Sequence, residues 1–237
     1  MQPFPFSLAN KFYEYFTLES KGNLELSEFN IIFSYNSSLE IFFEDGSKID
    51  IDQMEYIILS NESRINYWNK SEGIAVCLKN NSHLKKINSY ENKSKTKLKL
   101  EEGYLVKKPW GRELWLTGLE PIGNVVLKFI EIKAGTKTSL QAHEYKYESY
   151  FIVSGKAIFR SSRKKFQGKE CTYSLVDYEV DKPYVFDVEP LTVHQVEAVT
   201  DIVLIEASTN HLDDVIRLND EHGRGDGRIY SEHSASQ

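Results

Sequence analysis

Short apolar runs, each bounded by polar or turn-forming residues, follow one another along most of the chain. Runs of this length that are rich in Ile, Val, Phe and Tyr are typical of β-strands. The predicted strands and hairpins lie at residues 29–35, 39–51, 55–60 and 73–79 in the first half, and at 124–132, 149–155, 156–162, 184–189, 193–199 and 202–208 in the second. Many short strands at even spacing predict an all-β barrel or sandwich.

Two segments depart from this strand pattern. Residues 7–20 are predicted to form a short helix or an N-terminal arm. Near the other end, Asn210 is suited to begin a helix whose body is residues 212–220. Asp213 and Asp214 favour this interpretation, because acidic side chains stabilise the positive first turn of a helix. The sequence therefore predicts one short C-terminal helix in an otherwise all-β chain.

A polar segment divides the chain into two halves. Residues 83–99 contain six lysines and one acid, Glu91. A charge run of this kind is usually solvated, so it predicts a linker, and a basic patch for an anionic ligand is the alternative. The predicted parts are a β-rich N-terminal domain of unknown role, a basic polar linker, a second β-domain and a flexible tail, at residues 1–85, 86–100, 101–228 and 229–237.

The composition narrows the class of protein. A hydrophobic content of 41% is enough to build a core, and the net charge of −6 lacks the basic field of a general nucleic-acid binder. Cys77 and Cys171 are far apart and form no CxxC motif, which fits a reducing cytoplasm. The first residues show no signal-peptide pattern, and no apolar run has the length of a membrane span. We therefore expect a cytoplasmic protein without nucleic-acid or membrane partners.

Candidate metal ligands gather within residues 135–155. Gln141 and His143 are two positions apart, so on a strand their side chains point to the same face. Glu148 follows a predicted bend, and His194 belongs to a separate predicted strand. One amide, two imidazoles and one carboxylate form a mixed N/O ligand set that suits Zn, Fe, Mn, Ni or Co. The alternative for Gln141 is that its amide orients a water or a sugar.

This stretch resembles the first motif of the cupin superfamily, G-x5-H-x-H-x4-E-x6-G. The motif is matched at every interval by Gly135, His143, Glu148 and Gly155. Gln141 stands where the first His is usual, and His194 matches the end of the second cupin motif. The resemblance implies a double-stranded β-helix (jelly-roll) barrel with one divalent metal ion, zinc being expected and Mn, Fe, Co or Ni the alternatives. The strand density of the first half predicts a second, degenerate cupin-like barrel.

Gln at the first ligand position resembles the C-terminal domain of type II mannose-6-phosphate isomerases, including those fused to mannose-1-phosphate guanylyltransferase. The shared stretches are Lys108-Pro109-Trp110-Gly111, residues 139–143, Asp213-Asp214 with Arg217, and Asp220 with Gly223-Arg224. The resemblance covers residues 105–228, and the Gly-rich nucleotide loop of the guanylyltransferase is missing. Beside the predicted ligands, Lys146 and Tyr147 replace a common Arg-Ala pair. These replacements leave the identity of the substrate open.

The resemblance also implies catalytic and substrate-binding residues. Lys128 lies in an apolar strand, where a buried ammonium group needs a partner, and an edge position is the alternative. The candidate catalytic residues are Lys128, Glu197 and Arg224. Lys108, Arg217 and Arg224 are candidate substrate-binding residues, since arginine matches phosphate oxygens. For the two arginines the alternative is a salt bridge at the end of the predicted helix.

Three functions are compatible with this resemblance. The first is a metal-dependent sugar-phosphate isomerase or epimerase in carbohydrate or surface-polysaccharide precursor metabolism. The second is a non-catalytic cupin that binds a sugar or sugar nucleotide, and the third is a metal-dependent dioxygenase. The fold alone does not decide among them. Because cupins often dimerise, we expect a homodimer.

Overall fold

The computed structural model describes residues 7–9, 13–26, 29–60, 64–70, 75–80, 97–99, 101, 103–116, 125–168, 174–181, 184–224 and 227–229. Its strands form two compact units, Met1–Gly103 and Tyr104–Gln237. Within these described ranges there is no apolar helix of the length that a bilayer span requires. The all-β class predicted from the sequence is confirmed in both units.

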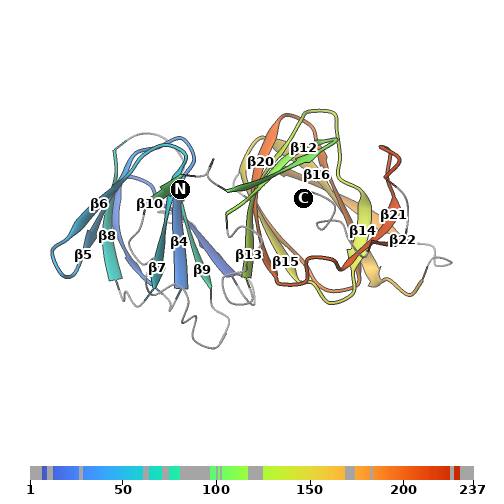
Figure 1. The fold of residues 1–237 in the computed structure, drawn as a ribbon, viewed down its shortest axis with the longest axis horizontal. Coiled ribbons are helices and arrows are strands. Elements are labelled where there is room, and N and C mark those ends of the chain that lie inside the picture. The colour runs from blue at the N-terminus through green and yellow to red at the C-terminus, as the bar shows by residue number, and fades with distance from the viewer. Residues whose placement is uncertain are drawn as a thin grey trace. The chain divides into compact units, whose positions relative to one another are not determined.

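The first unit, blue to green in Figure 1, contains two antiparallel sheets. The six-stranded sheet has the order β1-β2-β9-β4-β7-β10, formed by Ser7–Ala9, Tyr13–Thr17, Ala75–Asn80, Phe29–Ser34, Glu55–Ser60 and Lys97–Lys99. The four-stranded sheet has the order β3-β8-β5-β6, formed by Lys21–Glu25, Arg64–Asn69, Leu39–Phe43 and Lys48–Ile51. In β8 exposed and buried residues alternate, so Ile65 and Tyr67 pack into the apolar core of this unit.

In two segments of the first unit the structure has strands where the sequence suggested a helix or arm, and a linker. Residues 7–20, for which a short helix was one option, contain β1 and β2. Because β2 pairs with β9, sheet pairing overrides the local helix preference of this segment. The predicted linker over residues 86–100 includes β10, which pairs with β7. The ion pair of 3.0 Å between Lys97 and Glu55 shows why a lysine-rich segment suits this sheet edge. Residues 86–96 of the linker and 230–237 of the tail lie outside the described residues.

The second unit contains two antiparallel six-stranded sheets that face each other across its interior (Figure 1). The first has the order β11-β12-β13-β20-β15-β18, formed by Tyr104–Lys108, Gly111–Trp115, Val125–Ile132, Ile202–Thr209, Glu148–Ser154 and Tyr184–Val188. The second has the order β17-β16-β19-β14-β21-β22, formed by Leu175–Asp181, Lys156–Lys165, Thr192–Ala198, Leu140–His143, Val215–Asn219 and Gly227–Ile229. Apolar side chains from both sheets, among them Ile152 and Val196, form the core between them.

The short C-terminal helix predicted over residues 212–220 is wrong. The segment contains β21, which is antiparallel to β14 and places Ile216 opposite Ala142. Val215 and Arg217 are buried while Ile216 and Leu218 are partly exposed, which is the two-residue period of a strand. Pairing with β14 therefore outweighs the helix-start signal carried by the two aspartates before it.

A tight turn at Gly155 joins β15 to β16. Gly155 has φ +85°, a conformation that favours glycine. A Cβ atom at this position would lie 2.2 Å from the backbone oxygen of Asp201. The turn glycine of the sequence motif is therefore required both by the backbone conformation and by a neighbouring chain segment.

Candidate functional site

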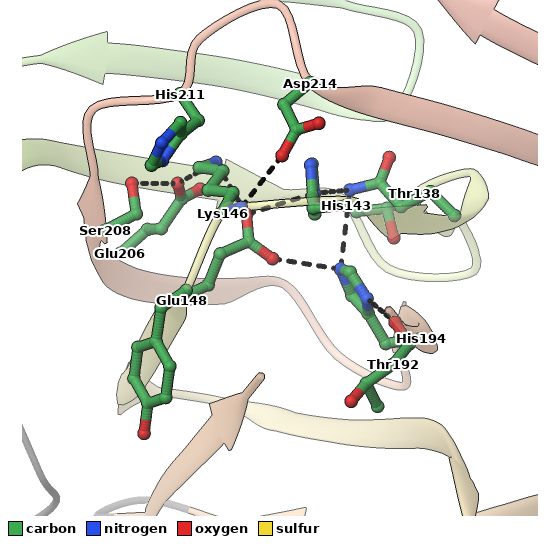
Figure 2. A network of polar contacts seen from close by, with 12 residues as sticks. Thr138, His143, Lys146, Glu148, Thr192, His194, Glu206, Ser208, His211 and Asp214 are labelled. Carbon is green, nitrogen blue, oxygen red and sulfur yellow. Dashed lines mark hydrogen bonds and ion pairs between the residues drawn. The ribbon is translucent and has the colours of Figure 1, made fainter. Parts of the chain in front are cut away.

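Four candidate ligands converge from both sheets of the second unit. Gln141 and His143 lie two residues apart on β14, and His194 on β19 is opposite Gln141 in the register. Glu148 begins β15 in the facing sheet. His143, Glu148 and His194 are 5%, 1% and 1% exposed. Figure 2 shows the Glu148 carboxylate directed towards the two imidazoles.

The spacing of the donor atoms fits one metal ion. Glu148 Oε1 lies 3.4 Å from His143 Nε2, and Glu148 Oε2 lies 3.1 Å from His194 Nε2. The Gln141 amide nitrogen is 3.4 Å and 3.5 Å from the same two imidazole nitrogens. Two donors that each lie about 2.0–2.1 Å from a shared ion are roughly 3.0–3.4 Å apart. The observed separations are therefore those of ligands around a common centre.

Hydrogen bonding and burial make the two imidazoles suitable ligands. His194 Nδ1 lies 3.0 Å from the Thr192 carbonyl oxygen, so the neutral ring donates from Nδ1 and presents a lone pair at Nε2. That lone pair faces Glu148 Oε2, a buried atom that accepts no hydrogen bond from the described residues. Two acceptors in contact inside a protein repel each other unless a proton or a metal ion lies between them. Burial also lowers the pKa of His143 to about 4, so this ring is neutral near pH 7.

The Gln141 amide is held by a neighbouring hydroxyl. Ser139 Oγ donates to Gln141 Oε1 over 2.8 Å, which leaves the amide nitrogen facing the imidazoles. Rotation of the amide by half a turn brings Oε1 to the imidazoles, and Ser139 Oγ then accepts from the amide nitrogen. The same contacts thus support either a ligand oxygen or a donor to a bound molecule, the two roles that the sequence left open.

A row of alternating charges extends from the candidate ligands through the interior. Lys146 Nζ is 2.6 Å from Glu148 Oε1 and 2.8 Å from Glu206 Oε1. Lys128 Nζ is 3.5 Å from Glu206 Oε1 and 3.4 Å from Glu113 Oε2. Glu113 Oε1 is in turn 3.8 Å from Lys108 Nζ. We call these six residues the charge row: Glu148, Lys146, Glu206, Lys128, Glu113 and Lys108.

The strand register explains how these charges meet in the interior. On neighbouring strands Lys128 is opposite Glu206 on one side and Trp115 on the other. Residues directly opposite in a sheet place their side chains on the same face. Lys128 Nζ lies 4.4 Å from the centre of the Trp115 ring, and Trp115 Nε1 donates to Glu113 Oε2 over 2.8 Å. Each buried charge therefore has a partner, and the edge position considered for Lys128 is wrong, because β13 lies inside its sheet.

The contacts within the charge row keep Lys146 and Glu148, the two members beside the other candidate ligands, ionised. Burial by itself disfavours the Lys146 ammonium group, but the Glu148 and Glu206 carboxylates raise the pKa of Lys146 above its ordinary value. Burial likewise opposes the charge of Glu148, but His143 and Lys146 lower the pKa of Glu148 well below its usual range. Burial and then Glu148 and Glu206 raise the pKa of Tyr150, so its phenol remains protonated. The site therefore offers a carboxylate ligand with an ammonium group in direct contact.

A cavity opens beside the candidate ligands, with an empty volume of about 670 Å³ when its mouth is included. The residues of the charge row line this cavity, as do Trp110, Gln141, His143, Tyr150 and Arg224. The structure thus brings Lys108, Lys128 and Arg224 to the space beside the candidate ligands. Arg224 is held by Asp220, whose Oδ2 accepts from Arg224 Nε over 2.8 Å.

Three other sequence-predicted residues do not line this cavity: the candidate ligand His194, Arg217 and Glu197. Arg217 is 3% exposed, and its Nη1 donates to the Arg224 carbonyl oxygen over 3.0 Å, so it supports the segment that carries Arg224. Glu197 forms an ion pair of 2.5 Å with Arg160. On β19 Glu197 is an odd number of residues from His194 and therefore lies on the opposite face of the strand.

Asp214 binds the loop that connects two candidate ligands. Its Oδ1 accepts from the Glu144 amide over 3.2 Å, and its Oδ2 accepts from the Tyr145 and Lys146 amides over 2.6 Å and 2.8 Å. The next amide, that of Tyr147, donates to Thr209 Oγ1 over 3.1 Å. Four successive amides between His143 and Glu148 are thus held by the side chains of Thr209 and Asp214.

Sequence reasoning missed three of these functional groups. Glu206 carried the same signal as Lys128, a lone charge in an apolar strand, and the same burial argument applies to it. Lys146 was noted only as a replacement beside the ligands. Asp214 was assigned to a helix start, and no local pattern indicates that it reaches a loop about 70 positions earlier.

Comparisons with known proteins identify the fold. No family model matches the chain, and no curated protein matches its sequence. A variant of Bacillus subtilis oxalate decarboxylase is 12% identical over 87% of this chain and 70% of its own, with a TM-score of 0.58. Lactobacillus farciminis oxalate decarboxylase in a formate complex is 10% identical over 87% and 78%, with a TM-score of 0.59. A Bacillus subtilis structure used to study the Mn(II) centres of that enzyme is 13% identical over 87% and 70%, with a TM-score of 0.57.

Identities this low establish a shared fold and leave the resemblance to mannose-6-phosphate isomerases a prediction. The matched 87% of the chain is more than the second unit alone, so the likeness extends into the first unit. Oxalate decarboxylase is a member of the cupin superfamily. The chain therefore has the cupin fold that the spacing of Gly135, His143, Glu148 and Gly155 predicted.

Proposed function

We propose that the protein is a metal-dependent isomerase or epimerase that acts on a sugar phosphate. The observation that carries this proposal is that His143 and Glu148, which form a cluster with His194, line one cavity together with several cationic side chains. Ligand nitrogens and oxygens at this spacing suit a divalent transition metal, with Zn or Mn as the first ions to test. Cationic groups in the same cavity suit the phosphate of a sugar phosphate.

The cavity residues divide into groups with separate roles in this proposal. Gln141, His143, Glu148 and His194 hold the ion, which polarises a carbonyl and its neighbouring hydroxyl group when bound. Lys128 is the residue that we assign to move the proton between adjacent carbons, because its Nζ lies between the carboxylates of Glu113 and Glu206 at the wall of the cavity. Lys108 and Arg224 hold the phosphate from the cavity wall.

The first test is metal analysis of the purified protein. The wild type is incubated with Zn, Mn, Fe, Co or Ni, passed through a desalting column and analysed by mass spectrometry. We expect one ion per chain, lost in the double variant His143→Ala/His194→Ala and kept in the control His211→Ala, whose histidine is exposed. A wild type that retains none of the five ions would contradict the proposal.

The second test follows the loaded protein with substrates. Mannose 6-phosphate and related sugar phosphates are incubated in D₂O, and exchange of the proton beside the carbonyl carbon is followed by NMR. We expect exchange that needs the ion and is lost in Lys128→Met. Binding without exchange would favour the non-catalytic sugar-binding module instead.

A second candidate function comes from the structural neighbours. Both named neighbours are oxalate decarboxylases, and one structure concerns Mn(II) centres. A small dicarboxylate would also meet the cationic side chains of this cavity. Oxalate is therefore tested beside the sugar phosphates with the Mn-loaded protein, and formation of formate and CO₂ would replace the isomerase proposal.

A further inference from the structure

Lys146 is bound to one oxygen of the carboxylate that a metal ion at this site would share. Its Nζ is 2.6 Å from Glu148 Oε1, and this oxygen is also 3.4 Å from His143 Nε2. The side chain of Lys146 is 7% exposed, so water does not weaken the contact. The other oxygen, Oε2, faces His194 Nε2, so a cation that uses both carboxylate oxygens shares Oε1 with the ammonium group or replaces it.

Lys146 has a second partner that remains when this contact is lost. Glu206 Oε1 lies 2.8 Å from Lys146 Nζ and accepts from Ser208 Oγ over 3.0 Å. Figure 2 shows Lys146 between the carboxylates of Glu148 and Glu206. The ammonium group can therefore leave Glu148 and stay in the cavity on Glu206.

The charges of the charge row balance before an ion binds. Its three lysines face its three glutamates, and beside the row Arg224 shares Asp220 with Arg217. A divalent ion adds two positive charges, and the candidate ligands other than Glu148 are neutral in their ligand form. The loaded cavity then matches a ligand with two negative charges, and a phosphate monoester carries about −1.5 to −2 near pH 7.

We propose that Lys146 is exchanged between Glu148 and an anionic ligand, so that metal binding releases its ammonium group to bind the phosphate of the substrate. This inference rests on the proposed function and names the residue that links its two ligands. In the metal-free protein Lys146 competes for Glu148 and weakens metal binding. In the loaded protein it makes phosphate binding depend on the ion.

The test measures the two ligands separately in Lys146→Met. Mn²⁺ is the metal, and free Mn²⁺ is quantified by its electron paramagnetic resonance signal. A hydrogen bond between charged groups corresponds to roughly a ten- to hundredfold change in an equilibrium constant. We therefore expect the Kd for Mn²⁺ to fall at least about tenfold in Lys146→Met, to stay near the wild-type value in Lys146→Arg, and to be unchanged in Lys107→Met, an exposed lysine on β11.

Inorganic phosphate is the second probe, and its ³¹P relaxation is measured with Mn²⁺-loaded and metal-free protein. We expect phosphate to bind the loaded wild type at least about tenfold more tightly than the metal-free protein, and this gain to be lost in Lys146→Met. An unchanged Mn²⁺ Kd in Lys146→Met, or a metal-dependent gain in phosphate binding that survives in it, would overturn the inference while the metal site stands. A wild type that binds neither Mn²⁺ nor any of the other four ions would overturn the proposed function as well.

Removal of a buried ammonium group leaves Glu148 and Glu206 without their shared partner, and Lys146→Met can fail to fold. The double variant Lys146→Met/Glu206→Gln removes one charge of each sign and keeps Glu148 as a ligand. We expect the same fall in the Mn²⁺ Kd for this double variant relative to the single variant Glu206→Gln. Equal Kd values for these two proteins would count against competition by Lys146.

Discussion

Asp214→Asn should loosen the loop between His143 and Glu148 without changing any candidate ligand. Asp214 Oδ2 accepts two amides, and an asparagine oxygen in the same place keeps both. The amide nitrogen of asparagine then faces the Glu144 N–H, where Asp214 Oδ1 accepted over 3.2 Å. One charge-assisted hydrogen bond is lost, and two donors are left in contact.

The magnitude follows from these contacts. A hydrogen bond to a charged group contributes about 1.5–3 kcal/mol, so we expect Asp214→Asn to lower the free energy of unfolding of the second unit by about 2 kcal/mol. Groups that orient metal ligands typically change metal affinity by about ten- to a hundredfold, so the Kd for Mn²⁺ should rise by about tenfold. Asp214→Ala removes all three acceptor contacts and should cost roughly 4 kcal/mol.

The assay must separate the two units, because chains with two domains need not unfold in one step. Trp68 lies in the first unit, whereas Trp110 and Trp115 lie in the second. In a Trp68→Phe background, urea unfolding followed by tryptophan fluorescence therefore reports the second unit. The measurement is made without metal, and Mn²⁺ binding is measured separately.

Asp213→Asn is the matched control, because Asp213 is exposed and adjacent in sequence. It should change the free energy of unfolding by less than about 0.5 kcal/mol, as surface substitutions usually do. If Asp214→Asn unfolds at the same urea concentration as the wild type and binds Mn²⁺ equally well, the idea that Asp214 holds the loop is refuted.

Two further predictions concern a turn and a buried acid. Gly155→Ala should lower the free energy of unfolding of the second unit by about 2–4 kcal/mol, because the φ of Gly155 is +85° and a Cβ atom there would lie 2.2 Å from the backbone oxygen of Asp201. The control Gly135→Ala has open space around the new Cβ atom and should cost only about 1 kcal/mol. Both values are measured by urea unfolding. Hydrogen bonds from Lys48 and Lys70 lower the pKa of Glu40 to about 2. Since the folded state then binds fewer protons, this stabilisation is complete above about pH 4.5 and is lost as the pH falls through about 2. In Glu40→Gln, the free energy of unfolding should lose the fall with pH that Glu40 contributes to the wild type. An acid-unfolding curve identical to that of the wild type would contradict this role of Glu40.

The sequence predicted which side chains gather at the candidate metal site because the relevant rules are local. The two-residue period puts Gln141 and His143 on one face of a strand, and the motif spacing supplies Glu148 and the turn at Gly155. Local reasoning of the same kind would also have indicated Glu206 as a candidate site residue, because its charge interrupts an apolar strand in the way that Lys128 does.

The rest of the site depends on pairing between distant strands. The meeting of Lys128 with Glu206 depends on the register of β13 and β20, which no local pattern specifies. For the same reason residues 212–220 carried a helix signal and formed a strand: the partner that decides their conformation, β14, lies about 70 positions earlier. The contacts of Asp214 follow from that pairing and were equally invisible.

The order in which these residues are synthesised has a consequence for the growing chain. All four candidate ligands leave the ribosome before β20, which carries Glu206, and before Asp214. A nascent chain that ends just after His194 therefore carries the complete ligand set, while Lys146 lacks one carboxylate and the loop amides lack their acceptor. During this interval the ligands are present but not yet positioned, so metal capture at the final affinity must wait until β20 and β21 have joined their sheets.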